Sequence, residues 1–170
     1  MPELIRPARP ADAEGIARTH SRSRAETYSG LLPEERIHEA DNLAHFWHGI
    51  LSGPRPPFVA VAQMPGQGGR ICGFVSTRAQ DDPELAQLGF RGEISALYLE
   101  RAAQGQGLGR KLFEAARRDL AARCPGPVSL WVLAANAPAR AFYTAMGGKP
   151  ILTRSDPGQP ALAEWVYGWA

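Results

Sequence analysis

The stretch of this sequence with the most evident chemistry is a glycine-rich turn, Gln104–Lys111, with glycine at every second position from Gly105 to Gly109. An apolar strand precedes the turn and an amphipathic run to Leu120 follows it, so the turn is expected to open a helix. Glycines leave backbone amides uncovered, and at a helix N-terminus these amides and the helix dipole attract anions. The turn therefore predicts a binding site for a phosphate-bearing cofactor.

Two common phosphate-binding loops do not fit these residues. A Walker loop needs Ser or Thr after its Gly-Lys pair to hold magnesium, whereas Gly109 is followed by Arg-Lys-Leu. A dinucleotide fingerprint needs the spacing GxGxxG and a carboxylate at the end of the next strand, whereas that strand ends in the apolar residues 133–135. The turn therefore belongs to another class.

A third class of turn fits both the glycines and a segment further along the chain. The spacing Gln104-x-x-Gly107-x-Gly109 after a strand resembles the acyl-CoA signature of the GNAT superfamily of N-acyltransferases. A lone signature of this kind is weak, but here a second motif follows in the expected order. The next strand and helix are similar to the second motif of that superfamily, carried here by Asn136, Ala139, Phe142, Tyr143 and Gly147.

The resemblance extends over essentially the whole chain. The strand Glu93–Leu99 is similar to the central strand of the superfamily, and residues 6–12 are similar to its first strand and helix start. One departure is Gly148, where the superfamily usually has an aromatic residue, so the packing near Tyr143 is expected to differ. The resemblance implies an α/β fold with a mixed, mostly antiparallel central sheet that is splayed at its fourth strand and flanked by helices.

For the acyl donor, the resemblance implies acetyl-CoA. The backbone of the central strand would align with the pantetheine arm through Ala96, Leu97, Tyr98 and Leu99, with an N–H near Leu97 meeting the thioester carbonyl. Asn136 would hydrogen-bond the same arm, cap its own helix, or do both. Arg110 and Lys111 either add charge near the phosphates or form a solvated helix face. The turn would hold the CoA pyrophosphate with Gln104, Gly105, Gln106, Gly107, Leu108, Gly109, Arg110 and Lys111.

Attack of an amine on a thioester needs a proton acceptor, an oxyanion site and a proton donor for the leaving thiolate. Tyr143 is the candidate general acid, because a phenol of pKa around 10 is close in basicity to a thiolate; the alternative is an aromatic core residue. Glu93 is the candidate general base, acting through water on an ammonium of pKa roughly 10; the alternative is an ordinary exposed strand residue. Alternation along the strand would place Glu93, Ser95, Leu97 and Leu99 on one face.

The acceptor pocket is defined less sharply by the sequence. Tyr28, Trp47 and Glu93 are the candidate acceptor-binding residues. His45 and His48 share a helix face without a third ligand, so no metal site is expected. The resemblance places other acidic and aromatic residues nearby, which suit a cationic amine: Asp81, Asp82, Glu84, Trp165 and Tyr167. The alternative for the three carboxylates is a solvated loop.

Hydrophobic periodicity assigns these residues to alternating elements. Asn136 is expected to cap a helix, and proline and glycine clusters separate the segments. The expected strands are 4–6, an antiparallel hairpin of 58–62 with 70–77, then 93–99, 128–133, 150–153 and 162–167. The first expected helical region starts at 11 and ends before a break at 28–33. The other expected helical regions are 33–51, the run up to 120 and 137–146, with 80–92 a loop.

Composition bounds the class of protein. A chain of 170 residues with 44% hydrophobic and 21% charged residues is expected to form a single domain over 1–170. A formal net charge of +2 gives no reason to expect nucleic acid as a partner. Cys72 and Cys124 form no CxxC pair and are expected to be packing residues in a reducing compartment. Without a signal segment or a membrane-length apolar run, a soluble cytoplasmic protein without a membrane partner is expected.

The sequence therefore predicts an N-acetyltransferase that moves an acetyl group from acetyl-CoA to a primary amine by direct attack. Its acceptor is expected to be a small molecule or an amino-acid-like compound. Two alternatives remain open: a CoA-binding sensor or interaction module without transfer, and an acetyltransferase for protein N-termini or lysines. A homodimer is one assembly that the resemblance allows.

Overall fold

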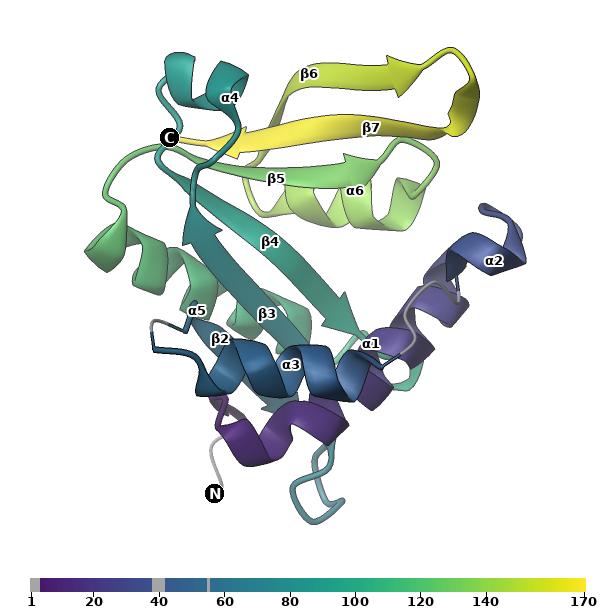
Figure 1. Cartoon of the computed structure of the whole chain (residues 1–170), viewed down its shortest axis with the longest axis vertical. Coiled ribbons are helices and arrows are strands. Elements are labelled where there is room, and N and C mark those ends of the chain that lie inside the picture. Colours follow the sequence, from purple (N-terminus) through teal and green to yellow (C-terminus); the bar gives the residue numbers. More distant parts are fainter. Residues whose placement is uncertain (1–3, 38–41, 55) are drawn as a thin grey trace.

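A computed structural model describes residues 4–37, 42–54 and 56–170. Within these residues seven strands form one sheet in the order β1-β2-β3-β4-β5-β7-β6 (Figure 1). Neighbouring strands are antiparallel except β4 and β5, which are parallel, so the predicted mixed, mostly antiparallel sheet is confirmed. The strands are β1 (Ile5–Pro7), β2 (Val59–Gln63), β3 (Ile71–Ala79), β4 (Gly92–Leu99), β5 (Val128–Leu133), β6 (Lys149–Asp156) and β7 (Gln159–Trp169).

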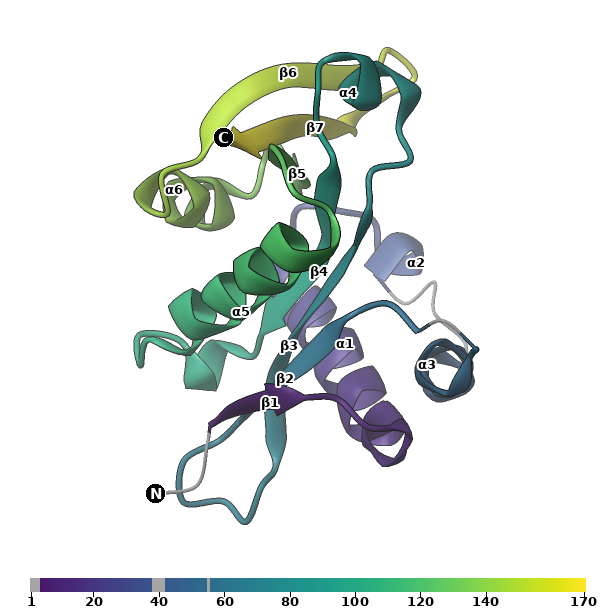
Figure 2. The same ribbon diagram turned by 90° about the vertical axis from the view of Figure 1, so that its left-hand side faces the viewer.

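Helices cover both faces of this sheet (Figure 2). The α1 and α3 helices bury a cluster around Ile16, Trp47 and Phe74 on one face, and α5 buries a larger cluster around Leu112 and Leu120 on the other. The α6 helix lies on the same side as α5 and covers β5 and β7. The helices are η1 (Pro10–Asp12), α1 (Ala13–Tyr28), α2 (Glu34–Ile37), α3 (Leu43–Ser52), α4 (Pro83–Gln87), η2 (Arg101–Ala103), α5 (Leu108–Arg123) and α6 (Ala137–Ala145).

The sheet opens between β4 and β5. Their ladder consists of Gly92 with Val128 and Glu93 with Ser129, and the two strands diverge beyond these pairs (Figure 1). Since β5 stays paired with β7 along its whole length, the divergence separates the sheet into two parts joined at one vertex. The predicted splay at the fourth strand is therefore present.

A β-bulge in β4 corrects the predicted alternation of side chains. Ala96 pairs with Ser76 but Ile94 pairs with Thr77, so Ser95 is an extra residue in β4. Before the bulge Ile94 packs on the α5 side, and after it Leu97 packs there. Glu93 therefore lies on the face opposite Leu97 and Leu99, and the prediction that they share one face is wrong.

A second correction concerns residues 80–92, which were expected to form a loop. They contain α4, because Asp82 accepts a hydrogen bond from the amide of Leu85 at 3.0 Å and Pro83 occupies the first turn. Leu85 is fully buried against Val166 of β7, which fixes this short helix to the sheet. The terminal strands are also longer than expected.

The structure explains why glycine occupies position 148, where the superfamily usually has an aromatic residue. A Cβ atom at this position would lie 2.5 Å from the ring of Trp169 and 2.9 Å from the carbonyl oxygen of Tyr143. Trp169 of β7 therefore fills the space beside α6, and its indole N–H donates to the carbonyl of Met146 at 3.1 Å. The aromatic packing near Tyr143 comes from a different strand.

Candidate active site

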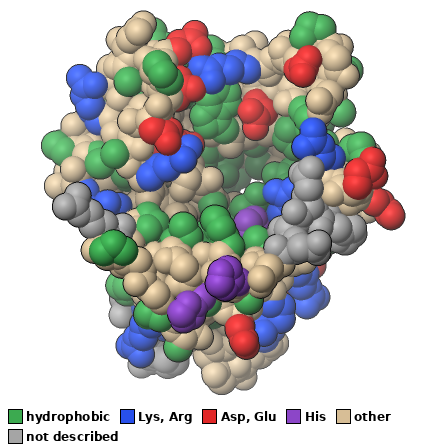
Figure 3. All heavy atoms as spheres, in the orientation of Figure 1, with side chains coloured by type: hydrophobic (Ala, Val, Ile, Leu, Met, Phe, Trp, Pro, Cys, Tyr) green, Lys and Arg blue, Asp and Glu red, His purple; other side chains and the backbone are tan. Residues whose placement is uncertain are grey.

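The divergence of β4 and β5 forms a cleft of about 1120 Å³. Figure 3 shows a hollow in this face of the molecule with many hydrophobic side chains around it. The cleft runs from the glycine-rich turn to the end of α1 and the middle of β7. Its lining includes residues 94–99 of β4, residues 130–133 of β5, Arg24 and Tyr28 of α1, Gln104, Gly105, Gly107, Gly109 and Arg110 of the turn, Asn136, Phe142 and Tyr143 near α6, and Glu164 of β7.

The ladder with β3 determines which backbone amides face this cleft. The amide of Glu100 donates to the carbonyl of Cys72 at 2.9 Å, and bonded residues alternate along an antiparallel strand. The amides of Leu97 and Leu99 therefore point toward β5, where the ladder has already ended. The side-chain amide of Gln104 donates to the carbonyl of Leu99 at 3.2 Å, which ties the turn to this strand.

The glycines of the turn are required by its backbone conformation. Gly105 has φ +75° and Gly107, the N-cap of α5, has φ +77°, a region that side-chain-bearing residues rarely adopt. A Cβ atom at either position would have no heavy atom within 4 Å, so their open side faces free space. The amides at the start of α5 are thus uncovered at the end of the cleft, which is the arrangement that an anion needs.

Three of the predicted turn residues lie outside the cleft lining. Leu108 is buried in the α5 core, and Gln106 donates back to the carbonyl of Ala102 at 3.3 Å. Lys111 lines a separate groove of about 660 Å³ between β1 and α5. Arg110 is exposed and does line the cleft, so of the two cations in this turn it is the one that faces the predicted phosphate site.

The turn is anchored to α1 by two carboxylates. Glu100 is fully buried, accepts from Thr19 at 3.2 Å and pairs with Arg70 at 2.5 Å. Glu26 accepts from the amide of Arg101 at 2.7 Å. These contacts hold the start of the turn in place before any ligand binds.

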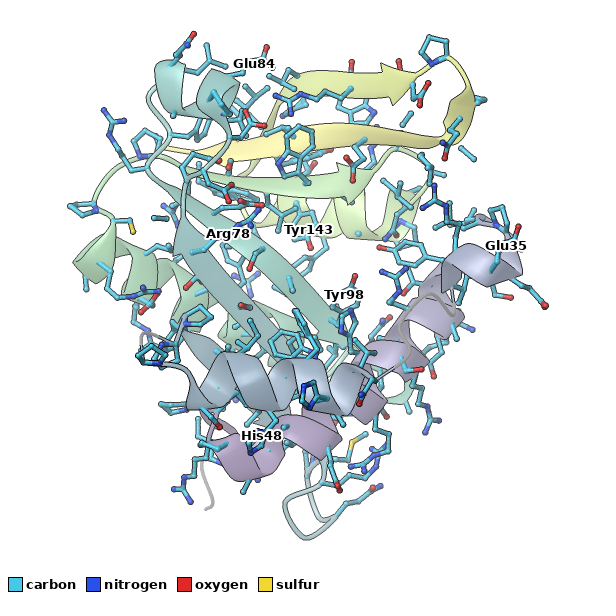
Figure 4. The ribbon with its side chains drawn as sticks, in the orientation of Figure 1. Glu35, His48, Arg78, Glu84, Tyr98 and Tyr143 are labelled. Carbon is cyan, nitrogen blue, oxygen red and sulfur yellow. The ribbon has the colours of Figure 1, made fainter. Side chains whose placement is uncertain are left out.

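Tyr143 and Tyr98 lie on opposite sides of the divergence (Figure 4). Tyr143 is 6% exposed, packs against Phe142 and Trp169, and lines the cleft. Burial raises the pKa of its phenol, and Tyr98 raises that pKa further. Asn136 caps α6 by accepting from the amide of Ala139 at 3.3 Å, so the predicted cap is present.

Glu93 does not line the cleft. Its carboxylate is 4% exposed and accepts from Nε of Arg78 at 2.8 Å. Burial raises the pKa of Glu93, and the hydrogen bond from Arg78 opposes that shift. The alternative of an exposed strand residue is therefore wrong, and a base at this position can reach an amine only through intervening water.

Of the other predicted acceptor residues, Tyr28 lines the cleft and Trp47 does not. Burial raises the pKa of Tyr28, and the neighbouring Tyr98 contributes to the same direction. Trp47 is 4% exposed in the α3 core, and its indole N–H donates to Nδ1 of His20 at 3.2 Å. Burial lowers the pKa of His20 to about 4, so this imidazole is neutral and acts as an acceptor.

The acidic loop residues are engaged in ion pairs outside the cleft. Asp81 pairs with Arg78 at 3.2 Å, and Asp82 and Glu84 both pair with Arg154. Trp165 stacks under Arg140 at 4.5 Å and faces α6. The pairs of Asp82 and Glu84 with Arg154 hold α4 against β6.

Glu164 is a cleft residue that the sequence reasoning missed. It stands two positions before the buried Val166 in β7, so it interrupts the apolar face of that strand. A charged residue in phase with buried ones was the signal that could have found it.

Neither a metal site nor a membrane span is found in the described ranges. No three His, Cys, Asp or Glu side chains there lie close enough together to bind a metal ion. No helix there combines the length and apolar character that crossing a bilayer requires. His45 and His48 are exposed on α3, where Figure 4 shows His48.

A sheet splayed beside a glycine turn at a helix N-terminus defines the class of acyl-CoA-dependent N-acyltransferases. Residues 20–147 match the model of the acetyltransferase (GNAT) family. The chain belongs to this family, whose enzymes use acetyl-CoA as acyl donor, so the family predicted from the two motifs is confirmed.

Sequence relatives and solved structures agree with this assignment. A mycothiol acetyltransferase of Catenulispora acidiphila is 41% identical over 48% of this chain and 26% of its own length. One of a Nocardioides species is 30% identical over 80% of this chain and 45% of its own. The chain thus spans about half the length, or less, of the curated relatives it matches.

The fold itself recurs in solved structures of low sequence identity. A PaiA N-acetyltransferase of Thermoplasma acidophilum in complex with coenzyme A superposes with a TM-score of 0.74 at 17% identity, covering 96% of both chains. A GNAT acetyltransferase of Streptococcus pneumoniae gives 0.66 at 20% identity, covering 98% of both. The predicted fold class is therefore confirmed.

Proposed function

We propose that this protein transfers an acetyl group from acetyl-CoA to the primary amine of a small molecule. The observation that carries the proposal is that one cleft joins the uncovered amides of the glycine turn to the free amide of Leu97 and the phenol of Tyr143. A donor lying along this cleft would place its phosphates at the turn and its thioester beside Leu97.

Binding of the donor relies on groups that are already in position. The pyrophosphate would accept hydrogen bonds from amides of residues 105–109, and the positive end of the α5 dipole and Arg110 add attraction. The pantetheine arm would form hydrogen bonds with the edge of β4 beyond the end of the β4–β5 ladder, since the backbone amides of β4 there are available as donors. Asn136 and Phe142 face it from the α6 side.

The chemical step requires one bond to form and one to break. The amine nitrogen attacks the thioester carbon, and the amide of Leu97 stabilises the oxyanion that develops. The C–S bond then breaks, Tyr143 donates its proton to the leaving thiolate, and the proton that the nitrogen loses replaces the one that Tyr143 gave. The phenol of Tyr143 is protonated at neutral pH even at its ordinary pKa, so it has a proton to donate. Burial raises this pKa further, which makes the phenol a weaker acid than a solvent-exposed tyrosine.

The acceptor is proposed to be small because the acceptor end of the cleft is bridged. Arg36 of α2, which lines the cleft, donates to the side chain of Gln159 of β7 at 2.9 Å. This contact joins the two walls and leaves less room for a polypeptide. Relatives named mycothiol acetyltransferase support a small-molecule acceptor, although the chain covers about half of their length or less.

The test is thiol release from acetyl-CoA in the presence of a panel of primary amines, followed with a thiol reagent. We expect amine-dependent release of CoA and a product that is heavier by one acetyl group in mass spectrometry. Binding of acetyl-CoA in calorimetry without thiol release for any amine would favour the alternative of a CoA-binding module. Absence of both binding and release would refute the proposal.

A further inference from the structure

Glu164 presents a carboxylate to the cleft without a hydrogen-bonded partner in the part of the chain that the structure describes. It is half-buried and lies on β7 among the lining residues of the acceptor end. Carboxylates removed from water are normally paired, because desolvation without a partner is unfavourable. An unpaired carboxylate in a ligand cleft therefore points to a cationic ligand.

The ladder partner of Glu164 on β6 is a cation that already forms ion pairs with other carboxylates. Arg154 of β6 pairs with Glu164 in the ladder, but its guanidinium donates to both oxygens of Asp82, at 2.7 and 3.1 Å, and to Glu84 at 2.5 Å. It also stacks over Trp131 at 4.5 Å. Burial raises the pKa of Glu164, and the attraction of Arg154 only partly offsets this effect.

The register of the sheet places Glu164 close to the level of the proposed thioester site. The last ladder pair of β4 and β5 is Glu93 with Ser129. Leu133 lies four residues beyond this pair in β5, and Leu97 lies four residues beyond it in β4, where one of the four is the extra residue Ser95. Glu164 is the partner of Leu133 on β7. The carboxylate and the proposed oxyanion donor therefore lie within about one residue of the same level across the divergence.

Glu164 also lies on the face of the sheet that borders the proposed acceptor space. In β7, Trp165 packs on the α6 side, whereas Val166 packs with Trp131 on the opposite side. Alternation puts Glu164 on the same side as Val166. This is the side of the sheet on which α1 contributes Arg24 and Tyr28 to the cleft, so Glu164 faces the space left for the acceptor.

We propose that Glu164 binds the ammonium group of the acceptor and takes its proton before the amine attacks. This inference rests on the proposed acetyl transfer and specifies its acceptors as alkylamines that are protonated at neutral pH. The ammonium gives one proton to the Glu164 carboxylate and becomes the free amine. After attack, the nitrogen loses a second proton, which replaces the one that Tyr143 gives to the thiolate, and Glu164 returns its proton to solvent.

The test compares two acceptors of similar size and different charge in the variant Glu164→Gln. One is the alkylamine that gives the fastest thiol release, and the other is its O-alkylhydroxylamine analogue, which is uncharged at neutral pH. We expect kcat/KM for the alkylamine to fall about 100-fold, the usual contribution of a general base, and kcat/KM for the analogue to change less than about threefold. Glu164→Asp, which keeps the charge, should recover part of the loss.

Glu84→Gln is the matched control, because Glu84 pairs with the same Arg154 but is exposed and lies outside the cleft. It should retain the activity of the unaltered protein with both acceptors. The affinity of each variant for acetyl-CoA, measured by calorimetry, separates this inference from the donor half of the proposed function. Equal losses with the two acceptors, or an alkylamine rate within twofold of the unaltered protein, would overturn the role of Glu164.

Discussion

In the proposed mechanism, proton transfer to the leaving thiolate depends on a single hydroxyl, that of Tyr143. Removing it in Tyr143→Phe should lower kcat about 100-fold with little change in acetyl-CoA affinity, because the ring and its packing against Phe142 and Trp169 remain. Steady-state kinetics and calorimetry measure the two quantities. Tyr167→Phe is the control, since Tyr167 is a buried neighbour outside the cleft. A Tyr143→Phe enzyme with an unchanged rate and pH profile would show that another group is the acid.

For Glu93, the contribution to the free energy of unfolding can be measured separately from the predicted role as general base. Burial raises its pKa above that of the unfolded chain, so the folded state binds the proton more tightly. The unaltered protein should therefore gain stability relative to Glu93→Gln as pH falls through the raised pKa of Glu93, and lose that advantage as pH rises. Denaturant unfolding of both proteins between about pH 4 and 8 measures the difference.

The catalytic assay of Glu93→Gln tests the base role that the sequence predicts for Glu93, which stays a prediction and competes with the role proposed for Glu164. A loss of about 100-fold in kcat with unchanged acetyl-CoA binding would support proton transfer from the amine to Glu93 through water. An unchanged kcat would leave Glu93 as the buried partner of Arg78 beside the vertex of the sheet.

At the scale of elements, the turn before α5 is expected to control donor binding. Gly107→Glu places a carboxylate where the pyrophosphate would lie and should abolish acetyl-CoA binding in calorimetry. Gly107→Ala imposes the same left-handed backbone strain, about 1 kcal/mol, without the charge, and should weaken binding far less. Circular dichroism should show both variants folded. Acetyl-CoA affinity retained in folded Gly107→Glu would contradict this placement of the phosphates.

Elements whose signals are local could be predicted from the sequence. The cap at Asn136 and the glycine turn were found because each depends on a few adjacent residues. The capping signal at Asp82, followed by proline, is equally local. The bulge at Ser95 could not be predicted, since it is defined by pairing with β3. Glu164 carries a local signal, a charged residue in phase with buried ones. That it has no hydrogen-bonded partner among the described residues could not be predicted, because this depends on contacts that occupy Arg154 from α4.

At the scale of the whole molecule, the proposed donor would join two parts of the sheet that share few direct contacts across the divergence. One part contributes β4 and the turn, and the other contributes β5, β7 and α6, with the β4–β5 ladder ending at Glu93 and Ser129. A ligand bound to both parts stabilises the folded state by about 2.7 kcal/mol at a concentration of 100 Kd. For a chain of this size that corresponds to a rise of roughly 5–10 °C in Tm.

Differential scanning fluorimetry with CoA should show this rise, and hydrogen exchange should slow in β4 and in α6 together, because both contact the same ligand. Gly107→Glu is the control and should show neither effect at the same CoA concentration. Protection confined to residues 104–111, with α6 exchanging as in the free protein, would mean that CoA occupies the turn without spanning the cleft. The thioester would then not reach Leu97 and Tyr143, and the proposed transfer would lose its geometric basis.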